Sequence, residues 1–231
     1  MQRIRHATKR RRGALIAVVV LLILGLVLGF ASWGSNDYSS ANQSGASIAD
    51  QINSYQEYLA GAEAKYQAEQ SYENANTLAT GYQYLYQLYA SASEEENAPD
   101  YQAPAQAAAA NAAKYFKASC DLAPENLNDA GRARILANAG SMYYAAGDED
   151  AANACFEEAA AAAPHDIEMA ANYAGYLYAT QGLSAAEDYL NTYIDGLPMG
   201  SSDVEQAKSL IERYQKLDSF NASLKGTSEN Q

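Results

Sequence analysis

The sequence has few of the side chains on which most enzymes and metal sites depend. Its 231 residues include two cysteines, Cys120 and Cys155, and two histidines, His6 and His165, which lie far apart in the chain. No group of His and Cys therefore has the spacing of metal ligands. Nucleophile elbows, nucleotide-binding loops and dinucleotide fingerprints are also absent from the sequence. We predict no catalytic residue, no metal site and no cofactor, and we expect that the protein is not an enzyme.

Beyond residue 33 the chain is also poor in β-branched residues, and no alternation of apolar and polar residues persists. This pattern disfavours β-strands. Alanine and tyrosine replace the larger aliphatic residues there, and the mean hydropathy of the whole chain is −0.35. The composition therefore argues against a fold built on sheets.

Basic residues are scarce after the first 33 positions. Residues 1–33 carry six Lys and Arg and no acid. The remainder contains nine Lys and Arg and all 28 Asp and Glu, so its formal net charge is −19. Phosphates are repelled by such a domain, so we expect no binding of nucleic acid. The acidic runs 94–96 and 148–150 lack the pattern of an EF-hand loop, and we interpret them as solvated loops.

One long apolar run is present, from Ala14 to Ala31. With its uncharged neighbours, residues 13–33 would span about 31 Å as a helix, close to the thickness of a hydrocarbon core. Residues 1–12 are basic, and no Lys or Arg follows until Lys65. The positive-inside bias then predicts a single-pass protein of the plasma (inner) membrane, with a cytoplasmic tail at 1–12, a transmembrane helix at 13–33 and an extracytoplasmic remainder.

The alternative for this segment is a cleaved signal peptide, with small residues near Ala31 as the cleavage site. The apolar run is longer than the usual core of a signal peptide, which favours a retained anchor.

Residues 133–164 show the spacing of a helical hairpin. Apolar and small residues recur three and four apart on two successive helices, and a Gly-Asp turn separates them. These residues are Leu136, Ala139, Gly140, Tyr143, Ala152, Phe156, Ala159 and Pro164. The pattern resembles one tetratricopeptide repeat. Residues 167–198 resemble a second repeat with one residue deleted in the turn, and 73–124 resemble a third, with an insertion near 93–104.

The resemblance implies an all-α fold, with an α-solenoid of about three hairpins, because one hairpin cannot bury its own apolar face. Around it we predict a flexible linker at 34–46, a juxtamembrane helix at 47–72, a capping helix at 201–219 and a disordered tail at 220–231. The capping helix begins with a capping box at Ser202. Whether 62–92 forms one helix or two stays open.

In tetratricopeptide repeats the first helices line a concave groove. By resemblance, the groove positions of this chain are Tyr82, Tyr86, Arg134, Asn138, Ser141, Tyr144, Asn172 and Tyr176. Tyrosine and asparagine there would bind an extended peptide. The alternative is that these tyrosines, among 19 in the chain, are packing residues. The same alignment offsets Cys120 from Cys155 by about 7.5 Å along the helices, which favours two buried thiols over a disulfide.

We therefore expect a membrane-anchored extracytoplasmic protein that mediates protein–protein interaction, as a chaperone-like factor or adaptor for envelope or secreted proteins. Its partner would be a protein or peptide. One alternative is a scaffold or assembly subunit of a membrane complex. Another is a cell-wall saccharide-binding module that stacks sugars on tyrosine rings.

Overall fold

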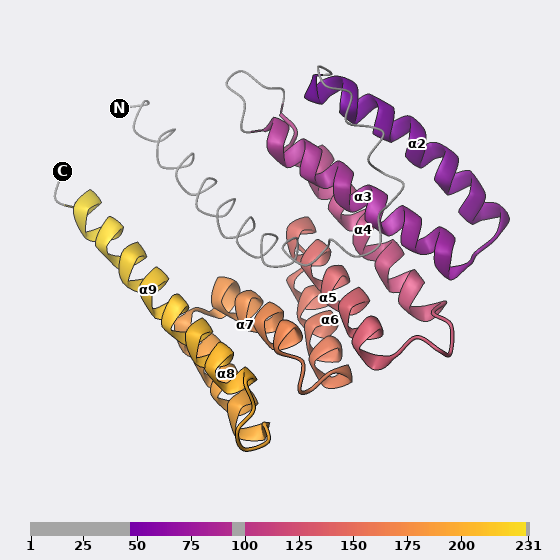
Figure 1. The fold of residues 1–231 in the computed structure, drawn as a ribbon. Helices are drawn as coiled ribbons and strands as arrows, with labels where there is room; N and C mark the ends of the chain where they lie inside the picture. The colour runs from indigo at the N-terminus through magenta and orange to yellow at the C-terminus, as the bar shows by residue number, and fades with distance from the viewer. Residues whose placement is uncertain (1–46, 94–99, 230–231) are drawn as a thin grey trace. The chain divides into compact units, whose positions relative to one another are not determined.

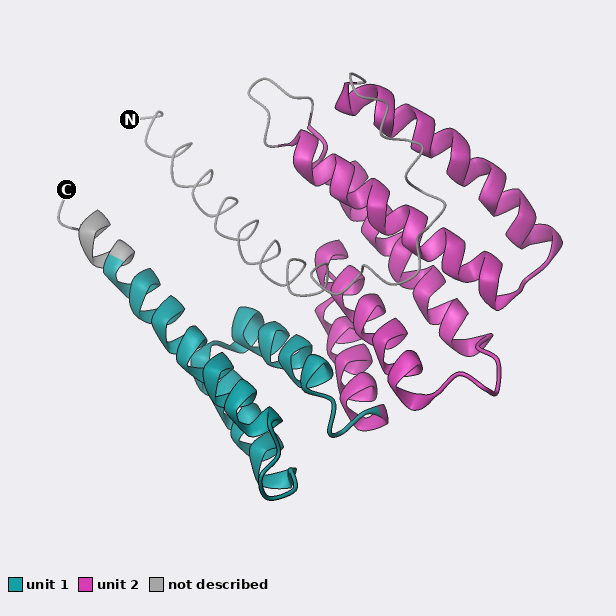
Figure 2. Ribbon diagram, viewed as in Figure 1, with its two compact units in different colours: residues 1–30, 163–231 teal, residues 31–162 magenta. Residues whose placement is uncertain are grey.

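The computed structural model describes residues 47–93 and 100–229, and all of its regular structure is helical, without strands among these residues. The helices, as labelled in Figure 1, are α2 (Ile48–Ala68), α3 (Tyr72–Ala92), α4 (Gln102–Asp121), α5 (Asp129–Ala146), α6 (Glu149–Ala162), α7 (Ile167–Gln181), α8 (Leu183–Gly196) and α9 (Asp203–Glu229). The predicted all-α class is confirmed. The described helices form two compact units, α2–α6 and α7–α9 (Figure 2).

Short polar side chains begin several of these helices. Ser47 and Asp50 form a capping box at the start of α2, and the Ser71 hydroxyl accepts the N–H of Asn74 at the start of α3. The side chains of Asn128 and Asp166 cap α5 and α7 in the same way. Each cap satisfies N–H groups that the first helical turn leaves without a partner.

The segment 62–92 contains the end of one helix and all of a second. α2 ends at Ala68, and α3 begins at Tyr72 after the Ser71 cap. The Asn74 side-chain amide also donates a hydrogen bond of 2.9 Å to the carbonyl of Glu69. These local hydrogen bonds fix the break between α2 and α3, so the segment 62–92 belongs to two helices and not to one.

Consecutive helices pack against each other within the α2–α6 unit, α3 on α4, α4 on α5 and α5 on α6. The ends of α4 and α6 precede Pro124 and Pro164 by a few residues, as predicted. Arg132 on α5 donates from Nη1 to the carbonyl of Cys120 at 3.0 Å, which places a cation and a donor at the C-terminal end of α4.

The hairpin of α5 and α6 uses its small residues as the sequence predicts. A Cβ added to Gly140 would lie 3.0 Å from the Phe156 ring and 3.2 Å from the carbonyl oxygen of Ala152. The absence of a side chain therefore lets α6 approach α5 closely. Gly147 ends α5 with φ +89°, a conformation that glycine adopts without strain.

Gly81 on α3 lies against α2. Its missing side chain leaves room for that helix, since an added Cβ would lie 2.7 Å from Cδ2 of Leu59. Gly140, by contrast, lies against α6, the second helix of its own hairpin.

The hairpin of α7 and α8 repeats the burial pattern of α5 and α6. Gly175 and Gly182 follow Gly140 and Gly147 by 35 residues, and Gly182 has φ +92°. On the second helices the offset is 34 residues, because α8 begins one residue after its glycine and α6 begins two after. The corresponding buried pairs are Ala152 with Ala186, Phe156 with Leu190 and Ala159 with Tyr193.

The α7–α9 unit has its own core between its three helices. Ala174, Ala186, Leu190 and Ala207 are fully buried there. One side of α9 packs on the preceding hairpin, with Ala207, Leu210 and Tyr214 buried. This side of α9 is what closes the apolar core of the unit.

Both ends of α9 differ from the sequence-based expectation. At its start, the Ser201 hydroxyl accepts the N–H of Asp203 at 3.2 Å, whereas the Ser202 hydroxyl points to the Asp203 carboxylate. At its other end, the helix continues to Glu229, into the tail 220–231 that we expected to be disordered. No proline interrupts this part of the chain, and the Asn221 amide reaches the Tyr178 hydroxyl at 3.5 Å.

The Tyr214 hydroxyl is buried and has no hydrogen-bond partner among the described residues, while its ring stacks on Tyr178 at 4.9 Å between centroids. Because an unpaired buried hydroxyl has lost its hydrogen bonds to water, Tyr214→Phe is expected to leave the free energy of unfolding unchanged or to raise it by up to about 1 kcal/mol. Urea unfolding followed by circular dichroism measures the difference. A loss of more than about 1 kcal/mol would show that the hydroxyl is satisfied.

The tail 1–12, the transmembrane helix 13–33 with its Ala14–Ala31 run, and the linker 34–46 all lie outside the described residues. Among the helices that the structure does describe, none combines the length and apolarity needed to cross a membrane.

Candidate functional site

The eight predicted groove residues differ widely in exposure. Four are buried, with Tyr86 and Asn172 8% exposed, Ser141 7% and Tyr176 3%. Tyr82, Asn138 and Tyr144 are half-buried, and Arg134 is exposed. They lie on α3 and α5 in the α2–α6 unit and on α7 in the α7–α9 unit. A side chain that is almost fully buried offers little area to a ligand, so the accessible part of the predicted groove is Tyr82 on α3 and the residues Arg134, Asn138 and Tyr144 on α5.

Tyr82 is engaged by a cluster of tyrosines from three helices. Its hydroxyl donates to Oε1 of Glu63 on α2 at 2.6 Å, and its ring stacks on Tyr115 of α4 with 5.8 Å between centroids. Tyr66 of α2 meets the same Tyr115 ring edge-on at 5.4 Å, and Nζ of Lys114 lies 5.1 Å from its centroid. Burial, followed by the hydrogen bond to Glu63, raises the pKa of the Tyr82 phenol above its usual value. With these contacts Tyr82 serves as a packing residue between α2, α3 and α4.

On α5 the predicted residues share one face, because Arg134, Asn138 and Ser141 are spaced four and three apart. The Ser141 hydroxyl is satisfied within the helix, donating to the carbonyl of Ala137 at 3.0 Å. Tyr144 lies one turn further on, and burial, followed by the charge of Glu149, raises the pKa of its phenol. The face therefore carries, along one line, a guanidinium, an amide and a phenol.

The two asparagines among the predicted groove residues carry side-chain amides that are not used within the fold. Neither the Asn138 nor the Asn172 side-chain amide forms a hydrogen bond with another residue in the described part of the chain. A carboxamide both donates and accepts, so it can pair with the N–H and the C=O of a peptide main chain. Asn138 is the more accessible of the two, since Asn172 is buried.

Reasoning from the sequence missed Glu63, Tyr66 and Tyr115 as members of the Tyr82 cluster. Glu63 and Tyr66 lie in a charged, polar stretch of α2 that showed no apolar periodicity. Their position depends on how α2 packs across α3 and α4, which is a tertiary property. The one local signal was the unusual number of tyrosines.

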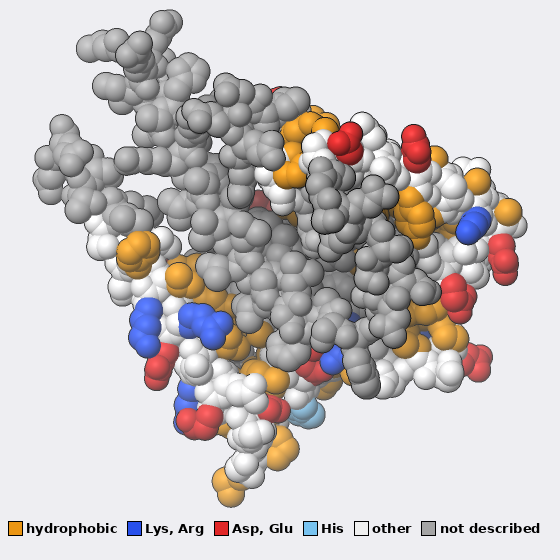
Figure 3. Space-filling view, turned by 45° about the horizontal axis from the view of Figure 1, so that its top comes forward, with side chains coloured by type: hydrophobic (Ala, Val, Ile, Leu, Met, Phe, Trp, Pro, Cys, Tyr) orange, Lys and Arg blue, Asp and Glu red, His pale blue; other side chains and the backbone are white. Residues whose placement is uncertain are grey.

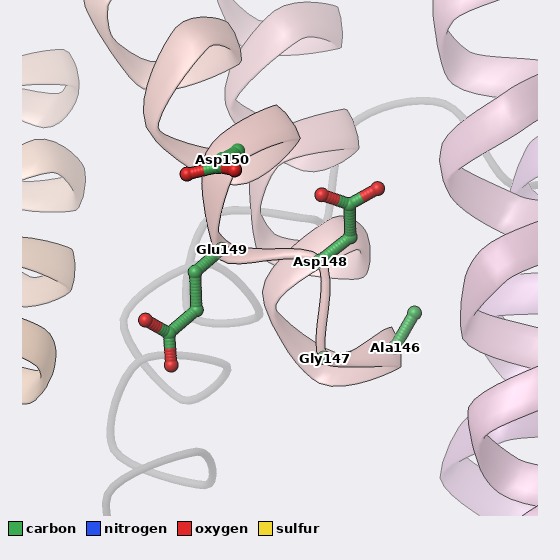
Figure 4. A pocket seen from close by; sticks show the side chains of 5 residues that line it. All are labelled: Ala146, Gly147, Asp148, Glu149 and Asp150. Carbon is green, nitrogen blue, oxygen red and sulfur yellow. The ribbon is translucent and has the colours of Figure 1, made fainter.

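A shallow hollow of about 520 Å³ opens at the turn between α5 and α6, lined by Ala146, Gly147, Asp148, Glu149 and Asp150. Its three carboxylates point in different directions (Figure 4). The Asp148 carboxylate accepts the N–H of Ala151 at 3.1 Å as a helix cap. Acidic side chains are spread over the face shown in Figure 3 and do not form one patch on it. Within the described residues, no group of three or more His, Cys, Asp or Glu could hold a metal ion.

Both cysteines are free and buried, with Cys120 4% exposed and Cys155 5%. Burial raises the pKa of each thiol, and the positive charge of Lys117 opposes that rise at both. A raised pKa leaves less thiolate at neutral pH, and the thiolate is the reactive species. The preferred sequence interpretation, two small buried residues, agrees with this structure.

These thiols are expected to be protected in the folded protein. At pH 8 an aromatic disulfide reagent should label Cys120 and Cys155 on the order of 100-fold more slowly than in 6 M guanidinium, because labelling requires opening of the structure. Cys120→Ser and Cys155→Ser separate the two sites. A thiol that reacts as fast in the folded chain as in the unfolded chain would contradict its burial.

Comparison of the chain with protein-family models, with curated proteins and with solved structures gave no match.

Proposed function

We propose that this chain is a membrane-anchored helical-repeat protein, similar to tetratricopeptide repeats, that binds extended segments of extracytoplasmic proteins. The repeat interpretation is supported by the hairpins α5–α6 and α7–α8. They share a buried glycine in the first helix, Gly140 and Gly175, a glycine of positive φ at the turn and the buried residues of the second helix, at offsets of 35 and 34 residues. Stacking of such hairpins gives an α-solenoid, the form of many proteins that bind peptides.

The observation that carries the binding function is the polar face of α5. Arg134 is exposed, Asn138 is half-buried with an amide that makes no hydrogen bond among the described residues, and Tyr144 is half-buried. An amide flanked by a guanidinium and an aromatic ring suits an extended peptide, because the amide pairs with the main chain and the ring supplies contact area. The first-helix position of this face agrees with the groove that the resemblance implies.

The anchor and the extracytoplasmic location rest on the sequence. The Ala14–Ala31 run has the length of a transmembrane helix, and the basic residues before it favour a cytoplasmic N-terminus. The strongly acidic domain beyond it makes nucleic acid an unsuitable partner. Chaperone-like or adaptor activity toward envelope or secreted proteins is the role that fits this arrangement.

Site-specific photo-crosslinking in the native host tests the function. Probes replace Arg134, Asn138 and Tyr144 one at a time, and crosslinked partners are identified by mass spectrometry. Crosslinks to many extracytoplasmic proteins are the expected result for a chaperone-like receptor, whereas one dominant partner would indicate a scaffold subunit. Absence of protein crosslinks at all three positions would refute peptide binding and favour a saccharide ligand.

A further inference from the structure

α2 is held to its neighbours by fewer buried side chains than α3, although both helices contain 21 residues. α2 buries Ile52, Leu59 and Ala62, and α3 buries nine residues. Since the burial of apolar area is the main source of packing energy, α2 is the less firmly attached of the two helices.

The other contacts that α2 makes with α3 and α4 are largely polar or between tyrosine rings. The Gln56 side-chain amide donates to the Tyr89 hydroxyl at 2.8 Å, and Glu63 accepts from Tyr82 at 2.6 Å. Tyr55 meets the Tyr84 ring at 4.5 Å between centroids. Water or a peptide ligand can replace hydrogen bonds of this kind at little net cost, because the net value of each is small.

Some features that stabilise α2 as a helix lie within α2 and its N-cap and do not depend on its neighbours. Its capping box of Ser47 and Asp50 is formed within the helix, and Lys65 lies in its last turn. Gly61 lowers its helical stability from within, and a Cβ at Gly61 would meet no atom within 4 Å. The connection to α3, residues 69–71, ends at the Ser71 cap of α3, so α3 keeps its start when α2 moves.

We propose that α2 is a detachable cover that opens as a unit while α3 and α4 stay folded. Opening exposes a surface of tyrosines on α3 and α4, formed by Tyr82, Tyr84, Tyr89 and Tyr115. Tyr82 is one of the predicted groove residues, so this surface extends the peptide-binding face to the first hairpin. The inference rests on the proposed function for its ligand, an extended peptide, and on the contacts of α2 for its opening.

Native-state hydrogen exchange on the full chain in membrane-mimetic detergent tests the opening without a ligand. We expect the amides of α2 to exchange at least about tenfold faster than those in the centres of α3 and α4. Gly61→Ala should slow exchange in α2 by about two- to fivefold, because alanine stabilises the helix without a clash. The matched control is Gly196→Ala at the end of α8, where an added Cβ also meets nothing within 4 Å and exchange in α2 should not change.

Exchange of α2 at the same rate as α3 and α4, unaffected by Gly61→Ala, would overturn the inference, because α2 would then open only when its neighbours do.

A crosslinking probe at Tyr84 supplies the second readout, since Gly61→Ala should lower its yield and Leu59→Ala should raise it. If α2 opens but the crosslinking yield at Tyr84 is the same in both variants, α2 does not cover a binding surface. That result would leave the proposal of peptide binding at α5 unaffected. If α2 opens separately but no probe on α5 captures a protein, the proposed function fails and the detachment of α2 is still established.

Discussion

Replacing Phe156 by alanine is expected to lower the free energy of unfolding of the α2–α6 unit by about 3–5 kcal/mol. Phe156 is 2% exposed, and its ring fills the space that Gly140 leaves between α5 and α6. The substitution removes the buried ring and leaves a cavity, since the helices cannot close the gap without moving backbone atoms. The loss is comparable with the whole stability of many domains.

Urea unfolding followed by circular dichroism gives this value. Phe220→Ala is the matched control, because Phe220 is 60% exposed and the same atoms are removed. The control should change stability by less than about 1 kcal/mol. Equal losses for the two variants would contradict the packing of α6 on α5 and, with it, the interpretation of Gly140 as a close-approach residue.

Leu190→Ala is expected to destabilise the α7–α9 unit by about 2–5 kcal/mol. Leu190 is fully buried among α7, α8 and α9, and it occupies the position in its hairpin that Phe156 occupies in the preceding one. Its side chain is smaller, so the cavity and the expected loss are smaller. Similar behaviour at these two positions is what a repeated hairpin predicts.

Leu122→Ala controls for the change from leucine to alanine, since Leu122 is 37% exposed at the end of α4. Hydrogen exchange resolves the effect by helix and should show faster exchange in α7, α8 and α9 for Leu190→Ala. A loss no larger than that of Leu122→Ala would show that Leu190 does not hold this core together.

The hairpins could be predicted because their signals are local. Glycine at 140 and 147, the apolar spacing through Ala152 and Phe156, and the prolines after the second helices all lie within one short stretch. Each has a direct physical consequence, namely close approach, a left-handed turn or a helix end. The one-residue difference between the turns after Gly147 and Gly182 could also be read from the alignment of the two segments.

The environment of the tyrosines could not be predicted in the same way. Position within a repeat put Tyr82 and Tyr176 on the groove side, but it did not show that Glu63 and Tyr115 engage Tyr82 or that Tyr176 is almost fully buried. Tyrosine suits both roles, with an apolar ring for packing and a hydroxyl for pairing. The extension of α9 to Glu229 was missed because a polar sequence without periodicity gives no signal for or against a helix.

The most direct test of the central claim, that the polar face of α5 binds a partner protein, compares two crosslinking probes in one hairpin. One replaces Asn138 on α5, and the other replaces Ala154, an exposed residue on α6. Binding on the face of α5 predicts a yield of protein adducts at least about tenfold higher from Asn138 than from Ala154, since a hydrogen-bonded partner concentrates at its own site. Equal yields from the two positions, or a higher yield from Ala154, would contradict the account.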